Sequence, residues 1–134
     1  MNIGIVGMGY VGATLAKAAF EVGHNVIGVE VNEARIKELS KIVIPISTDY
    51  DVLNDSEVIV IAVPTPLNLE KKPELKYLEQ ACSSINDVVN SSALVINEST
   101  SYPGTLRGFI RPRISRATSY ASAPERVEIG RAHV

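Results

Sequence analysis

The chain has 134 residues, 46% of them hydrophobic and 21% charged, with a formal net charge of −2. This composition is typical of one soluble globular domain, and the charge balance gives no electrostatic reason to expect a nucleic-acid partner. No apolar run approaches the roughly 20 residues that span a bilayer, no signal peptide is visible, and the single cysteine fits a reducing compartment. We therefore expect a cytoplasmic protein with neither nucleic acid nor a membrane as partner.

Short apolar runs alternate along the chain with segments of helical period, which is the pattern of a parallel sheet with crossover helices. We expect strands at residues 3–6, 25–31, 58–63, 93–96 and 119–123. We expect helices at residues 11–22, 33–39, 75–89 and 105–110. Gly23 closes the first helix, and Pro112 disturbs the end of the last.

Three glycines lie between the first predicted strand and the first predicted helix. In "GIVGMGYVG", Gly7, Gly9 and Gly12 have the spacing G-x-G-x-x-G, which is weak evidence alone but stronger between a strand and a helix. Gly7 permits a tight turn, Gly9 lets the backbone approach a pyrophosphate, and Gly12 lets the helix pack closely on the strand. The sequence therefore predicts an α/β fold, a Rossmann-like doubly wound parallel sheet in three α/β/α layers.

An acidic residue, Glu30, follows the second predicted strand eighteen positions beyond Gly12, near the ~20 expected for the acid that binds an adenosine ribose. A carboxylate there accepts hydrogen bonds from the ribose hydroxyls and repels a 2′-phosphate, so it favours NAD over NADP. Arg35 has three possible roles: it could cover the adenine side of the cofactor, bind a 2′-phosphate, or be a solvated helix residue.

Polar loops follow three later strands, and in an open parallel sheet ligands bind outside the carboxyl ends of the strands. "AVPTP" contains Thr65, "NESTSYPG" contains Ser99 and Thr100, and "ASAPERV" contains Glu125. These side chains are therefore expected where a nicotinamide and its substrate would lie. A purely structural turn is the alternative for each loop.

Two other features have plainer interpretations. The basic run of Arg107, Arg111, Arg113 and Arg116 is expected to form a solvated helix face rather than an anion site. Cys82 lies on the apolar stripe of a predicted helix, which favours a core position over a nucleophilic one.

Five motifs occur in the order found in the UDP-glucose/GDP-mannose dehydrogenase family: "GMGYVG", "VEVNEARI", "VPTPL", "ESTSYPGT" and "APERV". The chain resembles this family from Met1 to about Val127, and "VPTPL" and "PERV" are most similar to the branch that oxidises UDP-N-acetylhexosamines. The resemblance implies an NAD-dependent oxidoreductase that converts the primary alcohol of a UDP-sugar to a carboxylate with two NAD⁺. It also implies a homodimer at full length.

The resemblance assigns cofactor contacts to the residues that match the family's motifs. The pyrophosphate would be wrapped by Gly7, Gly9, Tyr10, Val11 and Gly12. The adenosine half would lie against Glu30 and Arg35. The rest of the cofactor would be lined by Thr65 and Ser99.

The resemblance also assigns catalytic roles: Thr100 would help to hold a catalytic water, and Glu125 would assist hydrolysis of a thioester intermediate. No metal is expected. The family's nucleophilic cysteine and its UDP-binding domain lie further along the chain than this sequence reaches. Residues 1–127 are therefore expected to be a truncated NAD-binding domain, inactive alone, whose sugar nucleotide binds through a missing domain.

The last residues of the chain are expected to be non-native, and two other functions are possible alternatives. "EIGRAHV" can be back-translated into a common sequencing adapter, so residues 128–134 are expected to be a non-native tail. One alternative is a hydroxyacid or acyl-CoA dehydrogenase, which would need a Lys or His base that the motif loops lack. The other is a non-catalytic NAD-sensing module.

Overall fold

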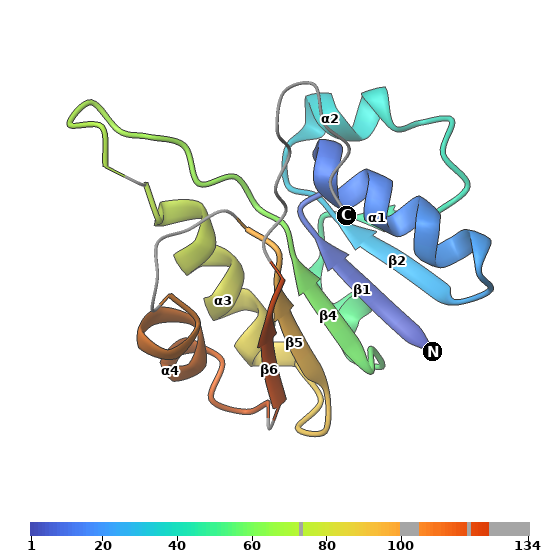
Figure 1. Cartoon of the computed structure of the whole chain (residues 1–134). Helices are drawn as coiled ribbons and strands as arrows, with labels where there is room; N and C mark the ends of the chain where they lie inside the picture. The colour runs from blue at the N-terminus through green and yellow to red at the C-terminus, as the bar shows by residue number, and fades with distance from the viewer. Residues whose placement is uncertain (73, 100–104, 118, 124–134) are drawn as a thin grey trace.

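The computed structural model describes residues 1–72, 74–99, 105–117 and 119–123. Its centre is a six-stranded sheet with the strand order β3-β2-β1-β4-β5-β6, and every pairing is parallel (Figure 1). The strands are β1 (Asn2–Val6), β2 (Asn25–Val29), β3 (Ile46–Ser47), β4 (Val58–Ile61), β5 (Leu94–Asn97) and β6 (Ser119–Ser122). This is the strand order of the Rossmann fold, so the predicted fold class is confirmed.

Helices cover both faces of the sheet. They are α1 (Tyr10–Glu21), α2 (Glu33–Glu38), the 3-10 turn η1 (Tyr50–Leu53), α3 (Lys76–Val88), the π-helical turn η2 (Leu106–Ile110) and α4 (Arg111–Arg113). In Figure 1, α3 and α4 lie on one side of the sheet and α1 on the other. These are the three layers that the sequence predicts.

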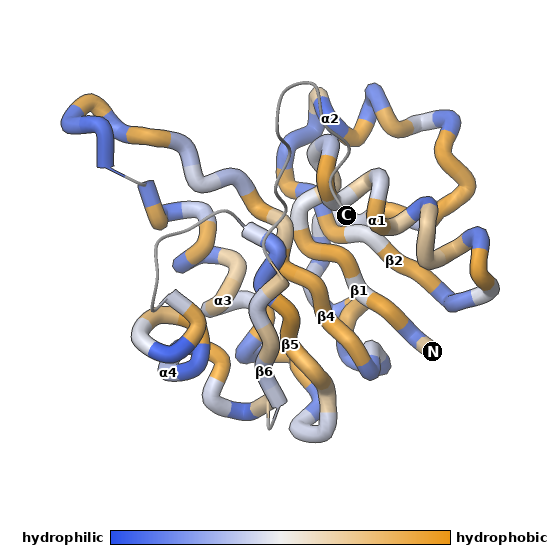
Figure 2. The backbone as a smooth tube through the Cα atoms, viewed as in Figure 1, coloured by the Kyte–Doolittle hydropathy of each residue, from blue (hydrophilic) through white to orange (hydrophobic). Residues whose placement is uncertain are grey.

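Alternate residues of the central strands enter two separate apolar cores, because successive side chains of a strand point to opposite faces. Ile59 and Ile61 of β4 pack in the core beneath α3, whereas Val60 packs in the core beneath α1. A strand covered on both faces must be apolar at nearly every position. That requirement explains the unbroken apolar run in β4, and Figure 2 shows the central strands as hydrophobic segments.

Two elements are not among the sequence-based predictions, and one predicted helix end differs. β3 and η1 lie between the helix expected at residues 33–39 and the strand expected at residues 58–63. The last helix continues past Pro112, since the N–H of Ile114 donates to the carbonyl of Ile110 at 2.9 Å. The π-helical turn η2 immediately precedes α4, in which Pro112 occupies the first turn.

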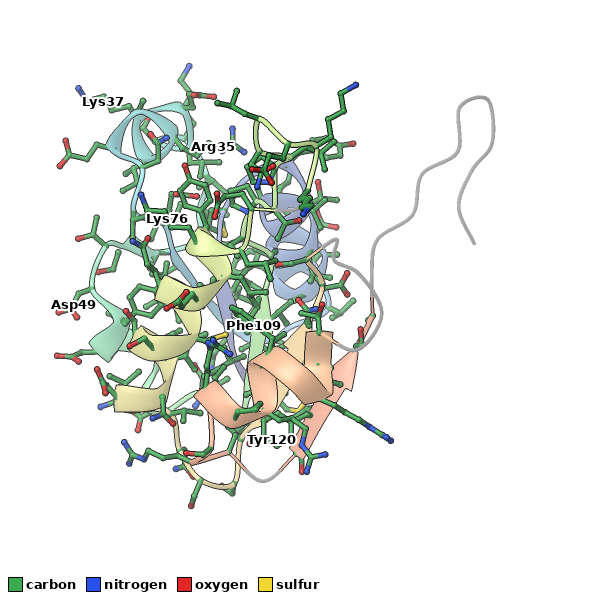
Figure 3. The ribbon with its side chains drawn as sticks, turned by 90° about the vertical axis from the view of Figure 1, so that its left-hand side faces the viewer. Arg35, Lys37, Asp49, Lys76, Phe109 and Tyr120 are labelled. Carbon is green, nitrogen blue, oxygen red and sulfur yellow. The ribbon has the colours of Figure 1, made fainter. Side chains whose placement is uncertain are left out.

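The late basic run supports the packing of α4. The guanidinium of Arg113 lies 3.7 Å from the ring centre of Phe109, and that of Arg111 lies 5.2 Å from the ring centre of Tyr120. Both aromatic residues are labelled in Figure 3. Arg116 donates to two carbonyl groups at the end of α3, at 3.2 and 3.1 Å, where helical carbonyls lack partners. Three of the four arginines therefore make structural contacts.

Cys82 is fully buried in the core beneath α3, and burial raises the pKa of its thiol from the ordinary 9.0 to about 12, against the opposing effect of Arg113. Between pH 9 and pH 12 the unfolded chain loses this proton while the folded chain keeps it. The free energy of unfolding should therefore fall as the pH rises, by at most about 1.4 kcal/mol per pH unit for this one group. Cys82→Ala should show a shallower fall in urea titrations between pH 8 and pH 11. An unchanged slope would contradict the assignment.

Candidate functional site

A cleft of about 950 Å³ opens at the carboxyl edge of the sheet. Its walls come from the β1–α1 turn, the end of β2, the loop after β4, and one side of α3 together with η1. It lies where the strand order reverses between β1 and β4, which is where open α/β sheets bind their ligands. In Figure 3, Arg35 of α2, Asp49 before η1 and Lys76 at the start of α3 mark the elements around it.

The β1–α1 turn can be built only with glycine at two positions. Gly7 has φ +93°, and a Cβ there would lie 2.6 Å from the carbonyl oxygen of Ala62. A Cβ on Gly12 would lie 1.8 Å from the carbonyl oxygen of Gly7. Gly12 does not line the cleft. Its contact is instead the close approach of α1 to the strand that its place in the motif predicts.

Gly9 has the opposite surroundings. It precedes the 12-residue helix α1 and lines the cleft, and a Cβ on it would meet nothing within 4 Å. Tyr10 and Val11, which begin α1, also line the cleft. The first N–H groups of a helix lack intrahelical partners and carry partial positive charge, so this surface suits a phosphate group. The turn therefore fits the pyrophosphate of a dinucleotide.

Glu30 and Arg35 both form hydrogen bonds with the backbone of Met8. The N–H of Met8 donates to Oε1 of Glu30 at 2.9 Å, and the N–H of Asn32 donates to Oε2 at 3.0 Å. Nε of Arg35 donates to the carbonyl of Met8 at 2.7 Å. A carboxylate has about four acceptor sites, so Glu30 keeps acceptor capacity for ribose hydroxyls while it holds the glycine turn in place.

Arg35 is not simply a solvated helix residue. Its side chain is 29% exposed, lines the cleft and pairs with Glu38 at 3.2 Å in addition to its bond to Met8.

The structural role of Met8 in this turn is not evident from the sequence. Its side chain packs so closely on β2 that a Cβ on Gly28 would lie 2.9 Å from Sδ of Met8.

Thr65 and Ser99, from the loops after β4 and β5, also line the cleft. The side chain of Ser99 is buried. Its hydroxyl donates to the carbonyl of Val63 at 3.0 Å, and its N–H donates to Oδ1 of Asn97 at 3.0 Å. Ser99 therefore joins the ends of β4 and β5 as well as lining the cleft. Thr100 and Glu125, the two predicted catalytic residues, lie outside the described residues.

Six further residues line the cleft that no motif indicated: Glu38 of α2, Tyr50 of η1, and Tyr77, Gln80, Ala81 and Ser84 of α3. Burial, together with the negative charge of Glu30, raises the pKa of Tyr50 to about 12, so its hydroxyl remains protonated at neutral pH. The only sequence signal for the α3 residues is their helical spacing, which matches one face of that helix.

The whole chain, residues 1–134, matches the model of the NAD-binding domain of the UDP-glucose/GDP-mannose dehydrogenase family. The chain belongs to this family. Its fold, the glycine turn and the acidic residue after β2 are those expected of an NAD-binding domain, and NAD is the family's cofactor.

Individual relatives agree with this assignment. Protein CapL of Staphylococcus aureus is 36% identical over 118 residues, which cover 77% of this chain and 28% of CapL. UDP-N-acetyl-D-mannosamine dehydrogenase of Methanocaldococcus jannaschii is 32% identical over 148 residues, which cover 94% of this chain and 34% of that protein. The chain thus spans about a third of the length of such family members.

Solved structures of family members have the same fold. The UDP-D-ManNAc dehydrogenase of Pyrococcus horikoshii superposes with a TM-score of 0.83 at 28% identity, covering 96% of this chain and 37% of that one. A ternary complex of GDP-mannose dehydrogenase from Pseudomonas aeruginosa gives a TM-score of 0.81 at 27% identity, over 96% of this chain and 37% of that one.

Two features are absent from the described residues. None of the helices in this part of the chain is long and apolar enough to cross a membrane. Among the same residues, no group of three or more His, Cys, Asp or Glu side chains is arranged to hold a metal ion.

Proposed function

We propose that this chain is the NAD-binding part of a nucleotide-sugar 6-dehydrogenase, which oxidises the primary alcohol of UDP-glucose or a UDP-N-acetylhexosamine to a carboxylate. The observation that carries the proposal is the pairing of an open glycine turn at Gly9 with the carboxylate of Glu30 across one cleft. Family membership supports it, and the printed names of relatives include dehydrogenases of UDP-N-acetyl-D-glucosamine and UDP-glucose.

In this proposal each part of the cleft has one task toward NAD, which supplies the hydride acceptor of the reaction. The N–H groups that follow Gly9 balance the charge of the pyrophosphate. Glu30 accepts hydrogen bonds from the adenosine ribose and repels a 2′-phosphate, while Arg35 holds the turn. Thr65 and Ser99 line the nicotinamide half.

The remaining roles are proposed from the family resemblance. Thr100 holds the attacking water, and Glu125 acts as its general base in the hydrolysis that releases the carboxylate. The sugar nucleotide binds through parts of the full-length protein beyond this chain. That protein is proposed to be a cytoplasmic homodimer.

Calorimetric titration of the chain with NAD⁺ tests the proposal, with Gly9→Ala as the informative variant. The added methyl group has space in the folded chain, so thermal stability should not change appreciably. It would stand between the backbone N–H groups and the phosphates, and losing one charge-assisted hydrogen bond weakens binding by roughly tenfold or more.

The matched control is Gly108→Ala, where a methyl group also meets nothing within 4 Å and the residue lies outside the cleft. It should bind NAD⁺ like the parent. If a correctly folded parent chain did not bind NAD⁺, the proposed function would be wrong. NADH formation from UDP-glucose by the full-length gene product tests the activity itself.

A further inference from the structure

Tyr50 of η1 lines the cleft, and so do Gln80 and Ser84 of α3. We propose that Gln80 recognises the adenine base of the bound dinucleotide through its carboxamide, with the base lying against the ring of Tyr50. The inference rests on the proposed function, because it assumes that NAD occupies this cleft.

The covalent structure of the dinucleotide sets where its base must lie. The pyrophosphate at Gly9 is joined to the ribose through C5′, and the ribose hydroxyls face Glu30. The base is attached to C1′, the carbon next to the one that bears the 2′-hydroxyl. It must therefore lie beside Glu30, on the side away from Gly9.

Tyr50 lies close to Glu30. It lines the cleft, packs against the apolar core beneath α3, and is close enough to Glu30 to feel the charge of its carboxylate. Its phenol stays neutral at working pH, so the half-buried ring presents an uncharged flat surface. Stacking of a base on an aromatic ring stabilises binding and is tolerant of base identity. Tyr50 can therefore hold a base without selecting adenine.

Gln80 can supply the selection. Tyr77, Gln80, Ala81 and Ser84 follow helical spacing and all face the cleft, and Ala81 is small enough to leave room in front of α3. Gln80 is exposed and lines the cleft, so its carboxamide can reach a ligand there. A glutamine carboxamide can accept from the 6-amino group of adenine while donating to N7. No other polar side chain on this stretch of α3 carries both a donor and an acceptor in that arrangement.

The test compares NAD⁺ with nicotinamide hypoxanthine dinucleotide, which has a carbonyl oxygen in place of the 6-amino group and a hydrogen on N1. Both ligands carry the same charge, so the ratio of their dissociation constants cancels general electrostatic effects. By calorimetry the parent chain should bind NAD⁺ about tenfold more tightly than the hypoxanthine analogue. Gln80→Ala should bind the two dinucleotides with about equal affinity. Gln80 is exposed, so this variant should melt at the parent's temperature.

Two further variants separate base recognition from a structural role. Gln80→Glu keeps the acceptor for the 6-amino group but loses the donor for a carbonyl oxygen, so its preference for NAD⁺ should equal or exceed the parent's. Glu79→Ala changes the neighbouring exposed residue of α3, which lies outside the cleft, and should keep the parent's ratio.

An equal affinity of the parent for both dinucleotides would overturn the inference, and so would an unchanged ratio in Gln80→Ala. Either result would leave the NAD site in place, because NAD⁺ would still bind. If neither dinucleotide bound, the proposed function would fail, and the inference with it.

Discussion

Replacing Gly12 by alanine should lower the free energy of unfolding by about 3 kcal/mol, at the upper end of the usual cost of overpacking. The new Cβ would lie 1.8 Å from the carbonyl oxygen and 2.9 Å from the carbonyl carbon of Gly7. Neither atom can move easily, because Gly7 has a positive φ and itself lies against the backbone of Ala62. Urea unfolding followed by far-UV circular dichroism measures the loss. NAD⁺ binding should be lost as well, since α1 must move away from the turn.

Gly108→Ala is the control for this prediction too, because its methyl group is unobstructed and alanine favours a helix. It should be at least as stable as the parent. If Gly12→Ala had the parent's stability, α1 could not lie as close to Gly7 as the structure places it.

The second large effect is expected from Glu30→Ala. This change removes the acceptor for the ribose hydroxyls and the acceptor for the N–H groups of Met8 and Asn32. Hydrogen bonds to a charged group contribute roughly 1.5–3 kcal/mol each, so the dissociation constant for NAD⁺ should rise by about tenfold to a hundredfold. The ratio of NADP⁺ to NAD⁺ affinity should increase, since the carboxylate no longer repels the 2′-phosphate and Arg35 remains nearby.

Glu33→Ala is the matched control, because it removes the same charge from an exposed position three residues away that does not line the cleft. Calorimetry should give the parent's affinities for both cofactors. Glu30→Gln should retain part of the loop's hydrogen bonding and lie between the parent and Glu30→Ala. If Glu30→Ala and Glu33→Ala lost the same amount of NAD⁺ affinity, Glu30 would act only through its charge and not through hydrogen bonds to the ribose.

Much of the site could be predicted because its residues obey local rules. Gly7 and Gly12 occupy positions where the backbone leaves no room for a side chain, and Gly9 lies in the open turn that lines the cleft. The distance along the chain from the glycine turn indicates Glu30, since a βαβ unit has a nearly constant length. The positions of Thr65 and Ser99 after strands indicate them, because the carboxyl ends of parallel strands lie at one edge of a sheet.

Other parts could not be predicted because their environment is made by distant segments. The two residues of β3 become a strand only by pairing with Gly28 and Val29 of β2. Met8 has no polar side chain to mark it, yet the two charged groups hold its peptide.

The sequence alone determined five of the six strands, the helices between them, the glycine turn and the position of Glu30, because apolar period and glycine spacing are properties of neighbouring residues. Only the tertiary structure decided that Tyr50 and Gln80 face the cleft. On the sequence, Gln80 is one more polar position on an amphipathic helix. Which polar positions meet a ligand rather than solvent depends on how α3 and η1 pack against the sheet, and that is set by the burial of both cores.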